Sequence, residues 1–198
     1  MDTSPQSLSQ WAQEAGRFSP PEWDRLPEIY LYMDQVLSYM DKQLELFERN
    51  PEDPLLTSSM VNNYVKAGVL PRPEQKKYSR EHLTLLTLIC LMKSVLSIPD
   101  ISALLRCQLK EHTEKDLYET FCSAQSRALQ EVCQRVQEGN EKGEDSLTQL
   151  AMELSVEASA RRTAAERILT EIALQKQLKE SPSAGEGKDH SKEKKEKD

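Results

Sequence analysis

The chain has 198 residues, of which 37% are hydrophobic and 30% charged, with a formal net charge of -7 and only 6 glycines. This length is enough for one or two small domains with a buried core, and the shortage of glycine and β-branched residues argues against a β-sandwich or barrel. No run of about 18 uncharged apolar residues occurs, so no membrane span is expected. The first residues lack the basic and apolar regions of a secretory signal. We therefore expect a cytoplasmic protein.

The charge is unevenly distributed along the chain. Residues 57–106 carry seven basic and three acidic residues, whereas residues 1–56 carry four basic and eleven acidic ones. The remainder, residues 107–198, has fifteen basic and nineteen acidic residues. One basic segment between two acidic ones indicates a surface for an anionic partner.

Proline spacing predicts an all-α fold. Nine prolines occur up to Pro99, and the next is Pro182. The long proline-free stretch is rich in residues with high helix propensity. Before it, residues 7–15 fit a short helix, and residues 28–48 have the apolar spacing of an amphipathic helix that ends before Pro51.

A short polar helix is predicted at residues 58–67. Thr57 or Ser58 can act as its N-cap, and Gly68 as its left-handed C-cap. A basic, proline-containing loop follows over residues 69–78.

Two more helices should complete the central region. Residues 80–96 have apolar side chains around nearly the whole circumference, with Ser79 as N-cap, so this helix should be the most buried. Ser97 and Asp100 form a capping pattern for a second helix that runs to Leu109.

The C-terminal region is predicted as two long helices, residues 114–138 and 145–178, with Gly139 and Gly143 at the break. Glu157 and Arg161 interrupt the apolar seam of the second helix, which favours an antiparallel helix pair or a dimerisation arm over a continuous coiled coil. Residues 181–198 are nearly all charged or small and should be disordered.

The sequence offers no pattern typical of an enzyme. The four cysteines form no C-x-x-C pair and have no histidine at ligand spacing, so buried thiols in a reducing compartment are expected. His82 is expected at the surface, at a helix start. No nucleophile with a neighbouring base, no glycine-rich phosphate loop and no metal-ligand or cofactor motif is apparent.

The order of elements in residues 57–105 resembles the DNA-binding half of a MerR-type winged helix-turn-helix. In that family a recognition helix leads through a tyrosine, a glycine and a proline into a short wing that ends in Tyr-Ser, and a helix pair follows. The residues that carry this resemblance are Tyr64, Gly68, Val69, Leu70, Pro71, Tyr78, Ser79, Ser97, Ile98 and Ile101.

A closer resemblance covers residues 26–105. This segment resembles a bacterial family known as domain of unknown function 1836, in the stretches LPEIYLYMDQV at residues 26–36, LTSSMVNNY at 56–64, KKY at 76–78 and LSIPDI at 96–101. The resemblance implies bacterial origin and a helix-turn-helix-like core, and it implies no biochemical activity.

The chemistry of this segment predicts contacts with duplex DNA. Asparagine can bond to both edge atoms of adenine, so Asn62 and Asn63 are candidate base readers. Ser58 and Ser59 at a helix N-terminus suit a phosphate, and Tyr78 would pack the wing or touch the DNA backbone. The candidate phosphate-neutralising residues are Lys66, Arg72, Lys76, Lys77 and Arg80.

We therefore predict a sequence-specific transcriptional regulator of MerR-like type that binds double-stranded DNA. Residues 26–109 would form its helix-turn-helix domain after an N-terminal segment, residues 1–25. Residues 110–180 would form a C-terminal helical region that makes a homodimer. The alternative is a non-enzymatic adaptor that uses the same fold to bind other proteins, and an enzyme is a third, weaker reading.

Overall fold

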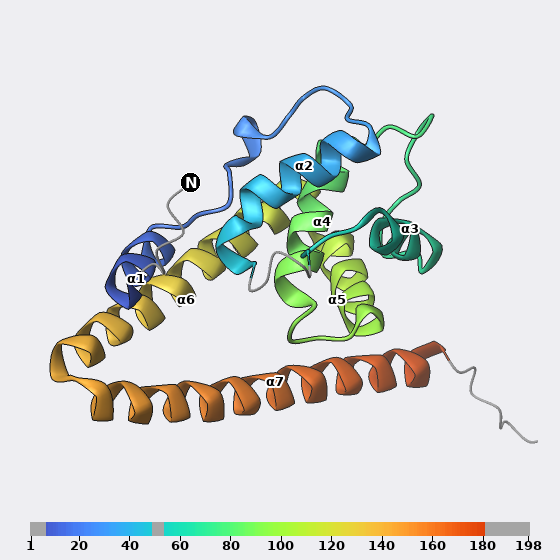
Figure 1. The fold of residues 1–198 in the computed structure, drawn as a ribbon. Helices are drawn as coiled ribbons and strands as arrows, with labels where there is room; N and C mark the ends of the chain where they lie inside the picture. The colour runs from blue at the N-terminus through green and yellow to red at the C-terminus, as the bar shows by residue number, and fades with distance from the viewer. Residues whose placement is uncertain (1–6, 49–53, 181–198) are drawn as a thin grey trace, which may run out of the picture.

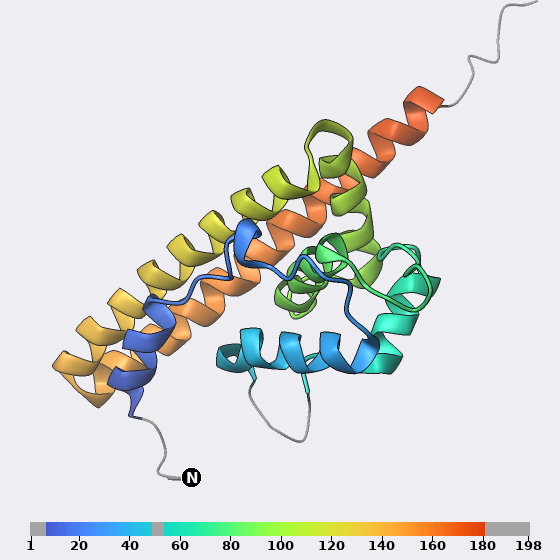
Figure 2. The ribbon, with the colours of Figure 1, turned by 90° about the horizontal axis from the view of Figure 1, so that it is seen from above.

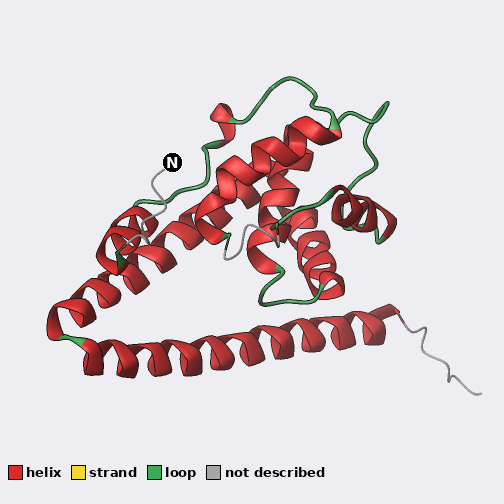
Figure 3. Ribbon diagram, viewed as in Figure 1, coloured by secondary structure: helices red, strands yellow, loops and turns green. Residues whose placement is uncertain are grey.

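A computed structural model describes residues 7–48 and 54–180, and within these ranges the chain is all-α, as the sequence predicted (Figures 1 and 3). The helices are α1 (Leu8–Gly16), α2 (Met33–Leu44), α3 (Ser58–Lys66), α4 (Arg80–Met92), α5 (Ile98–Glu111), α6 (Glu114–Lys142) and α7 (Glu144–Glu180), with 3-10 turns at Trp23–Arg25 and Glu45–Phe47. The predicted disordered tail, residues 181–198, lies outside the described residues. No helix in the described ranges has both the length and the apolar character needed to cross a bilayer.

Helix α4 is the centre of the main core. Every residue from His82 to Cys90 is buried, because α4 has neighbours on all sides: α2, α5 and α6 contact it directly. The burial of α4 confirms the prediction, made from the apolar residues around its circumference, that this helix is the most buried. A smaller core joins α1 to α6 and α7 through Ala12, Cys133 and Leu150.

Helix α2 starts later than predicted. Residues 28–32 do not join the helix, because Leu31 pairs with Tyr78 in an antiparallel bridge. The Leu31 amide donates to the Tyr78 carbonyl at 2.9 Å, and the Tyr78 amide donates back to the Leu31 carbonyl at 2.8 Å. The Gln35 side chain then accepts from the Tyr32 amide and caps α2. The predicted helix over residues 28–48 is therefore wrong at its start, and its last residues form a 3-10 turn.

Helices α6 and α7 leave their shared turn as an antiparallel pair that splays apart (Figure 1). Only one of the two predicted glycine breaks is correct. Gly143, with φ of +100°, makes the turn, whereas Gly139 is buried inside α6. A Cβ atom on Gly139 would lie 3.3 Å from Leu150 Cδ2, so a small residue there lets α7 approach α6. The C-terminal half of α7 then runs beside α5.

Candidate nucleic-acid interface

Helix α3 turns one face into the core and the other to solvent. The Thr57 hydroxyl accepts from the Met60 amide at 3.2 Å and fixes the start of the helix. Val61 and Tyr64 are buried, which sets the rotation of α3. As a result Ser58, Ser59, Asn62, Asn63 and Lys66 are all exposed.

The chain leaves α3 through a tight C-cap. Gly68 has φ of +70°, in the left-handed region that glycine adopts readily. The amides of Val69 and Leu70 both donate to the Tyr64 carbonyl, at 3.0 and 3.2 Å. Both side chains are buried, so they anchor the following loop next to α3.

The basic loop folds back in a two-residue hairpin turn. Gln75 and Lys76 have φ of +49° and +64°, and the Lys77 amide donates to the Glu74 carbonyl at 2.8 Å. Positive φ at both central residues is typical of the type I′ turn, whose twist suits a hairpin. Lys76 is exposed at the tip, and Lys77 is partly buried with its ammonium 5.4 Å from the centre of the Tyr32 ring.

Two predicted DNA-binding residues are placed differently from the others. Tyr78 is only 3% exposed and packs edge-on against His82. The Arg80 guanidinium forms an ion pair with Glu28 at 3.1 Å, donates to the Leu26 carbonyl at 3.3 Å and lies over the Trp23 ring. Both side chains therefore hold the 23–31 segment and the turn on α4.

The other eight residues lie on α3 and on the segment that follows it, which are on the same side of the molecule in both views, with the tip of the hairpin turn above α3 in Figure 1 (Figures 1 and 2). We call this surface the α3–turn face; its residues are Ser58, Ser59, Asn62, Asn63, Lys66, Arg72, Lys76 and Lys77. A hollow of about 360 Å³ on this face is lined by Asn62, Val65, Lys66 and Arg72. Two cations and an amide thus converge on one open depression.

Comparison with known proteins identifies this region. The family model described as Domain of unknown function (DUF1836) matches residues 21–122. The chain belongs to this family. No curated protein and no solved structure matches the chain. The DUF1836 match spans α2 to α5 and the first part of α6, so it contains the whole α3–turn face, whereas α1 and α7 lie outside it.

His82, which lies within the DUF1836 match, was predicted at the surface, and that prediction is wrong. It is 8% exposed, not at the surface. Its Nδ1 accepts from the Ser79 amide at 3.1 Å and lies 2.9 Å from the Ser79 hydroxyl, so His82 is the fourth residue of a capping box. Burial lowers the pKa of His82 below its usual value. The imidazole is therefore a neutral structural group at the base of the turn.

This pKa shift predicts an acid-sensitive fold. An unfolded chain binds the His82 proton more readily than the folded chain does, so the free energy of unfolding falls as the pH drops below about 6.5. In urea titrations we expect the wild type to lose more stability between about pH 7.5 and pH 5 than His82→Gln, because glutamine keeps the capping bond without titrating. Equal losses in both proteins would contradict this assignment.

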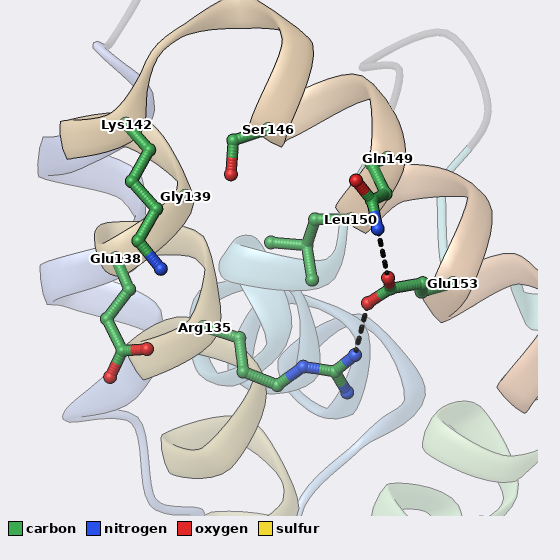
Figure 4. Close-up of a pocket in the computed structure, with 8 residues that line it drawn as sticks. All are labelled: Arg135, Glu138, Gly139, Lys142, Ser146, Gln149, Leu150 and Glu153. Carbon is green, nitrogen blue, oxygen red and sulfur yellow. Dashed lines mark hydrogen bonds and ion pairs between the residues drawn. The ribbon is translucent and has the colours of Figure 1, made fainter.

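A second hollow, of about 330 Å³, lies outside the DUF1836 match between α6 and α7 (Figure 4). The charged side chains around this hollow form ion pairs between α6 and α7. Arg135 bridges to Glu157 at 2.9 Å and to Glu153 at 3.5 Å, and Gln149 donates to Glu153. The glutamate that interrupts the apolar seam of α7 thus has a cationic partner on α6. This ion-pair network fastens α7, and Arg135 is engaged by these carboxylates.

Sequence reasoning missed a group of exposed apolar side chains beside the turn. Ile29, Tyr30 and Tyr32 are 70%, 55% and 51% exposed. They lie at the start of the segment, residues 28–48, that the sequence predicts as an amphipathic helix. The run IYLY at residues 29–32, made largely of residues with high strand propensity, is the signal that could have indicated an extended segment.

All four cysteines are free thiols. Cys90 and Cys133 are buried, as predicted, whereas Cys107 and Cys122 are partly exposed. Among the described residues, no cluster of three or more histidine, cysteine or carboxylate side chains could hold a metal ion.

Proposed function

We propose that the protein is a cytoplasmic bacterial transcriptional regulator that binds duplex DNA through the α3–turn face, with a MerR-like winged helix-turn-helix core and no catalytic activity. The observation that supports this best is the exposed polar face of α3 followed by a basic hairpin turn, with Lys66 and Arg72 lining one hollow. A helix and a wing at one end of a domain can contact the major groove and the adjacent backbone together.

The exposed side chains suit distinct parts of the duplex. Asn62 and Asn63, in the middle of α3, can each bond to adenine through an amide oxygen and nitrogen. Ser58 and Ser59 stand at the helix N-terminus, where free amides and the helix dipole favour a phosphate. The four cations of the α3–turn face supply the charge for the DNA backbone. Arg80 is not among them, because Glu28 and Leu26 engage it.

Salt dependence tests this assignment on the wild type. Each neutralised phosphate contributes about -0.9 to the slope of log affinity against log salt, so four cations predict a slope of roughly -3.5. We would measure fluorescence anisotropy with duplexes selected from a random library, with the unselected pool as the control. Absence of retention at about 50 mM salt, or no enrichment of any sequence, would contradict the proposal.

We further propose a homodimer formed by the C-terminal helices. The outer face of α7 carries large apolar side chains that are more than 40% exposed: Met152, Val156, Leu174 and Leu178. Val156 and Leu174 are eighteen residues apart, which is about five full turns, so they lie on one side of the helix. A second α7 packed there would bury both, and a two-fold dimer suits a pseudo-palindromic DNA site.

The dimer predicts a change of mass in solution. We expect Val156→Glu combined with Leu174→Glu to sediment as a monomer at concentrations where the wild type is a dimer, because the charges would be buried against the partner helix. Ile168→Glu is the matched control, because Ile168 is also exposed but lies on the side of α7 that bears Leu150, which packs against α6. A wild type that sediments as a monomer would contradict the dimer.

The protein-adaptor function remains the second candidate, and the exposed Ile29, Tyr30 and Tyr32 favour it. A cluster of apolar and aromatic side chains with charged neighbours is typical of a protein-binding surface. The two functions differ in one measurement: an adaptor would retain a protein partner that is lost on Tyr30→Ala and Tyr32→Ala, and it would not retain DNA.

A further inference from the structure

One contact between α5 and α7 joins two reactive side chains. The Lys176 amine lies 2.8 Å from the Cys107 sulfur, although the two residues are 69 positions apart. Cys107 is partly exposed and Lys176 is exposed, so small oxidants in solvent can reach both atoms. The pair lies well away from the α3–turn face along the sequence and belongs to different helices.

The other three cysteines are poorly placed for the same chemistry. Burial raises the pKa of the Cys90 and Cys122 thiols to about 11, and Cys133 is 2% exposed. Oxidation of cysteine depends on thiolate character and on access, both of which burial reduces. Cys107 differs from Cys90 and Cys133 because it is partly exposed, and it differs from Cys122 because a lysine amine lies against its sulfur.

The packing of α7 beside α5 keeps the Cys107 and Lys176 side chains next to each other. Leu169, about two turns before Lys176, is buried in the main core, and Ala165 is packed against that core. This part of α7 is therefore seated beside α5, and Lys176 continues along the same contact. A covalent link at this place requires little movement of either helix, because one bridging oxygen atom spans a nitrogen and a sulfur at about their present separation.

We propose that Cys107 and Lys176 form an oxidant-dependent covalent bridge in which one oxygen atom links the lysine nitrogen to the cysteine sulfur. Hydrogen peroxide first converts the thiol to a sulfenic acid and releases water. A second peroxide then oxidises the sulfenic acid and the neighbouring amine: the nitrogen–oxygen bond forms, nitrogen and sulfenic acid each lose one proton, and two waters leave. A dithiol reductant reverses the bridge to thiol, amine and water.

The bridge would fasten the C-terminal half of α7 to α5. Away from the turn at Gly143, α7 separates from α6 (Figure 1), so its C-terminal half gains most from a covalent anchor to α5. The anchor would tie the helix that carries the proposed dimer surface to the domain that carries the α3–turn face. The existence of the bridge depends on neither of those proposals, because it rests on the amine, the sulfur and the oxidant alone.

Mass spectrometry of the full chain tests the bridge directly. After limited exposure to hydrogen peroxide we expect a mass gain of one oxygen atom less two hydrogen atoms, and a proteolytic product that contains Cys107 and Lys176 in one cross-linked species. The number of titratable thiols should fall from four to three. Dithiothreitol should restore both the original mass and the fourth thiol.

Variants separate a covalent bridge from an ionic contact. Cys107→Ser and Lys176→Arg should both abolish the cross-linked species, and arginine at 176 keeps the positive charge. Cys122→Ser is the matched control, because Cys122 is also partly exposed, and it should leave the cross-link intact. The inference is overturned if wild-type Cys107 is recovered only as a sulfenic or higher acid, as a disulfide, or in a link to lysine without the added oxygen.

Discussion

Reversing the charges of Lys66 and Arg72 lowers the affinity for duplex DNA about 100-fold at low salt. Both residues line the hollow on the α3–turn face. Each reversal replaces an attraction to phosphate with a repulsion, which costs at least about 1.4 kcal/mol, a factor of ten per site. Loss of two contacts also makes the salt slope less steep by about 2. Anisotropy titrations of Lys66→Glu with Arg72→Glu at several salt concentrations measure both effects.

A second pair of variants controls for net charge. Lys42→Glu with Lys142→Glu changes the charge equally, but these exposed lysines lie on the last turn of α2 and the last turn of α6. This control should bind like the wild type apart from a weak long-range effect. Equal loss in both double variants would show that binding follows overall charge, and loss in neither would remove the α3–turn face from the proposed function.

Truncation of Tyr118 destabilises the fold by about 3–5 kcal/mol, the usual range for a large buried aromatic side chain. Tyr118 is 1% exposed on α6, and its ring meets Trp23 edge-on with 6.3 Å between ring centres. Its hydroxyl donates to the Pro21 carbonyl at 2.8 Å, and burial raises the pKa of Tyr118, so the hydroxyl stays a neutral donor. Tyr118 thus fastens the segment before α2 to the long helix.

A conservative variant divides this effect into packing and hydrogen bonding. Tyr118→Phe keeps the ring and should cost only about 1 kcal/mol, because it removes one hydrogen bond. Tyr30→Ala is the control, since Tyr30 is exposed and its truncation should change the free energy of unfolding by about 0.5 kcal/mol or less. Urea unfolding at neutral pH measures all three. A value for Tyr118→Ala close to that for Tyr30→Ala would contradict the role of Tyr118.

Much of the candidate site was predictable because local chemistry controls it. The N-cap at Thr57, the left-handed C-cap at Gly68 and the capping at Ser79 depend on neighbouring residues, and the structure has each of them as predicted. The burial of Val61 and Tyr64 follows from helical spacing, and it leaves Asn62, Asn63 and Lys66 outside.

Contacts between distant segments decided the rest. From the sequence, Arg80 is predicted to be one more phosphate-binding cation. In the structure it forms an ion pair with Glu28 and a hydrogen bond to the Leu26 carbonyl, both more than fifty residues earlier. His82 is buried because the turn folds back over the start of α4 and brings Pro71 and Arg72, ten or more residues earlier, beside the imidazole. The Lys176–Cys107 contact joins positions that no local pattern connects.

The sequence by itself determined the all-α class, the position of the central apolar helix and most helix ends, because propensity, apolar spacing and caps act over a few residues. Only the tertiary structure decided that residues 28–32 are extended, because the Leu31 amide and carbonyl bond to the backbone of Tyr78. Only the tertiary structure decided, likewise, that Gly139 continues α6, at a position where the lack of a side chain lets Leu150 pack closely. Backbone pairing and close helix packing depend on groups that are far apart in the chain, and local patterns carry no information on which distant groups will meet.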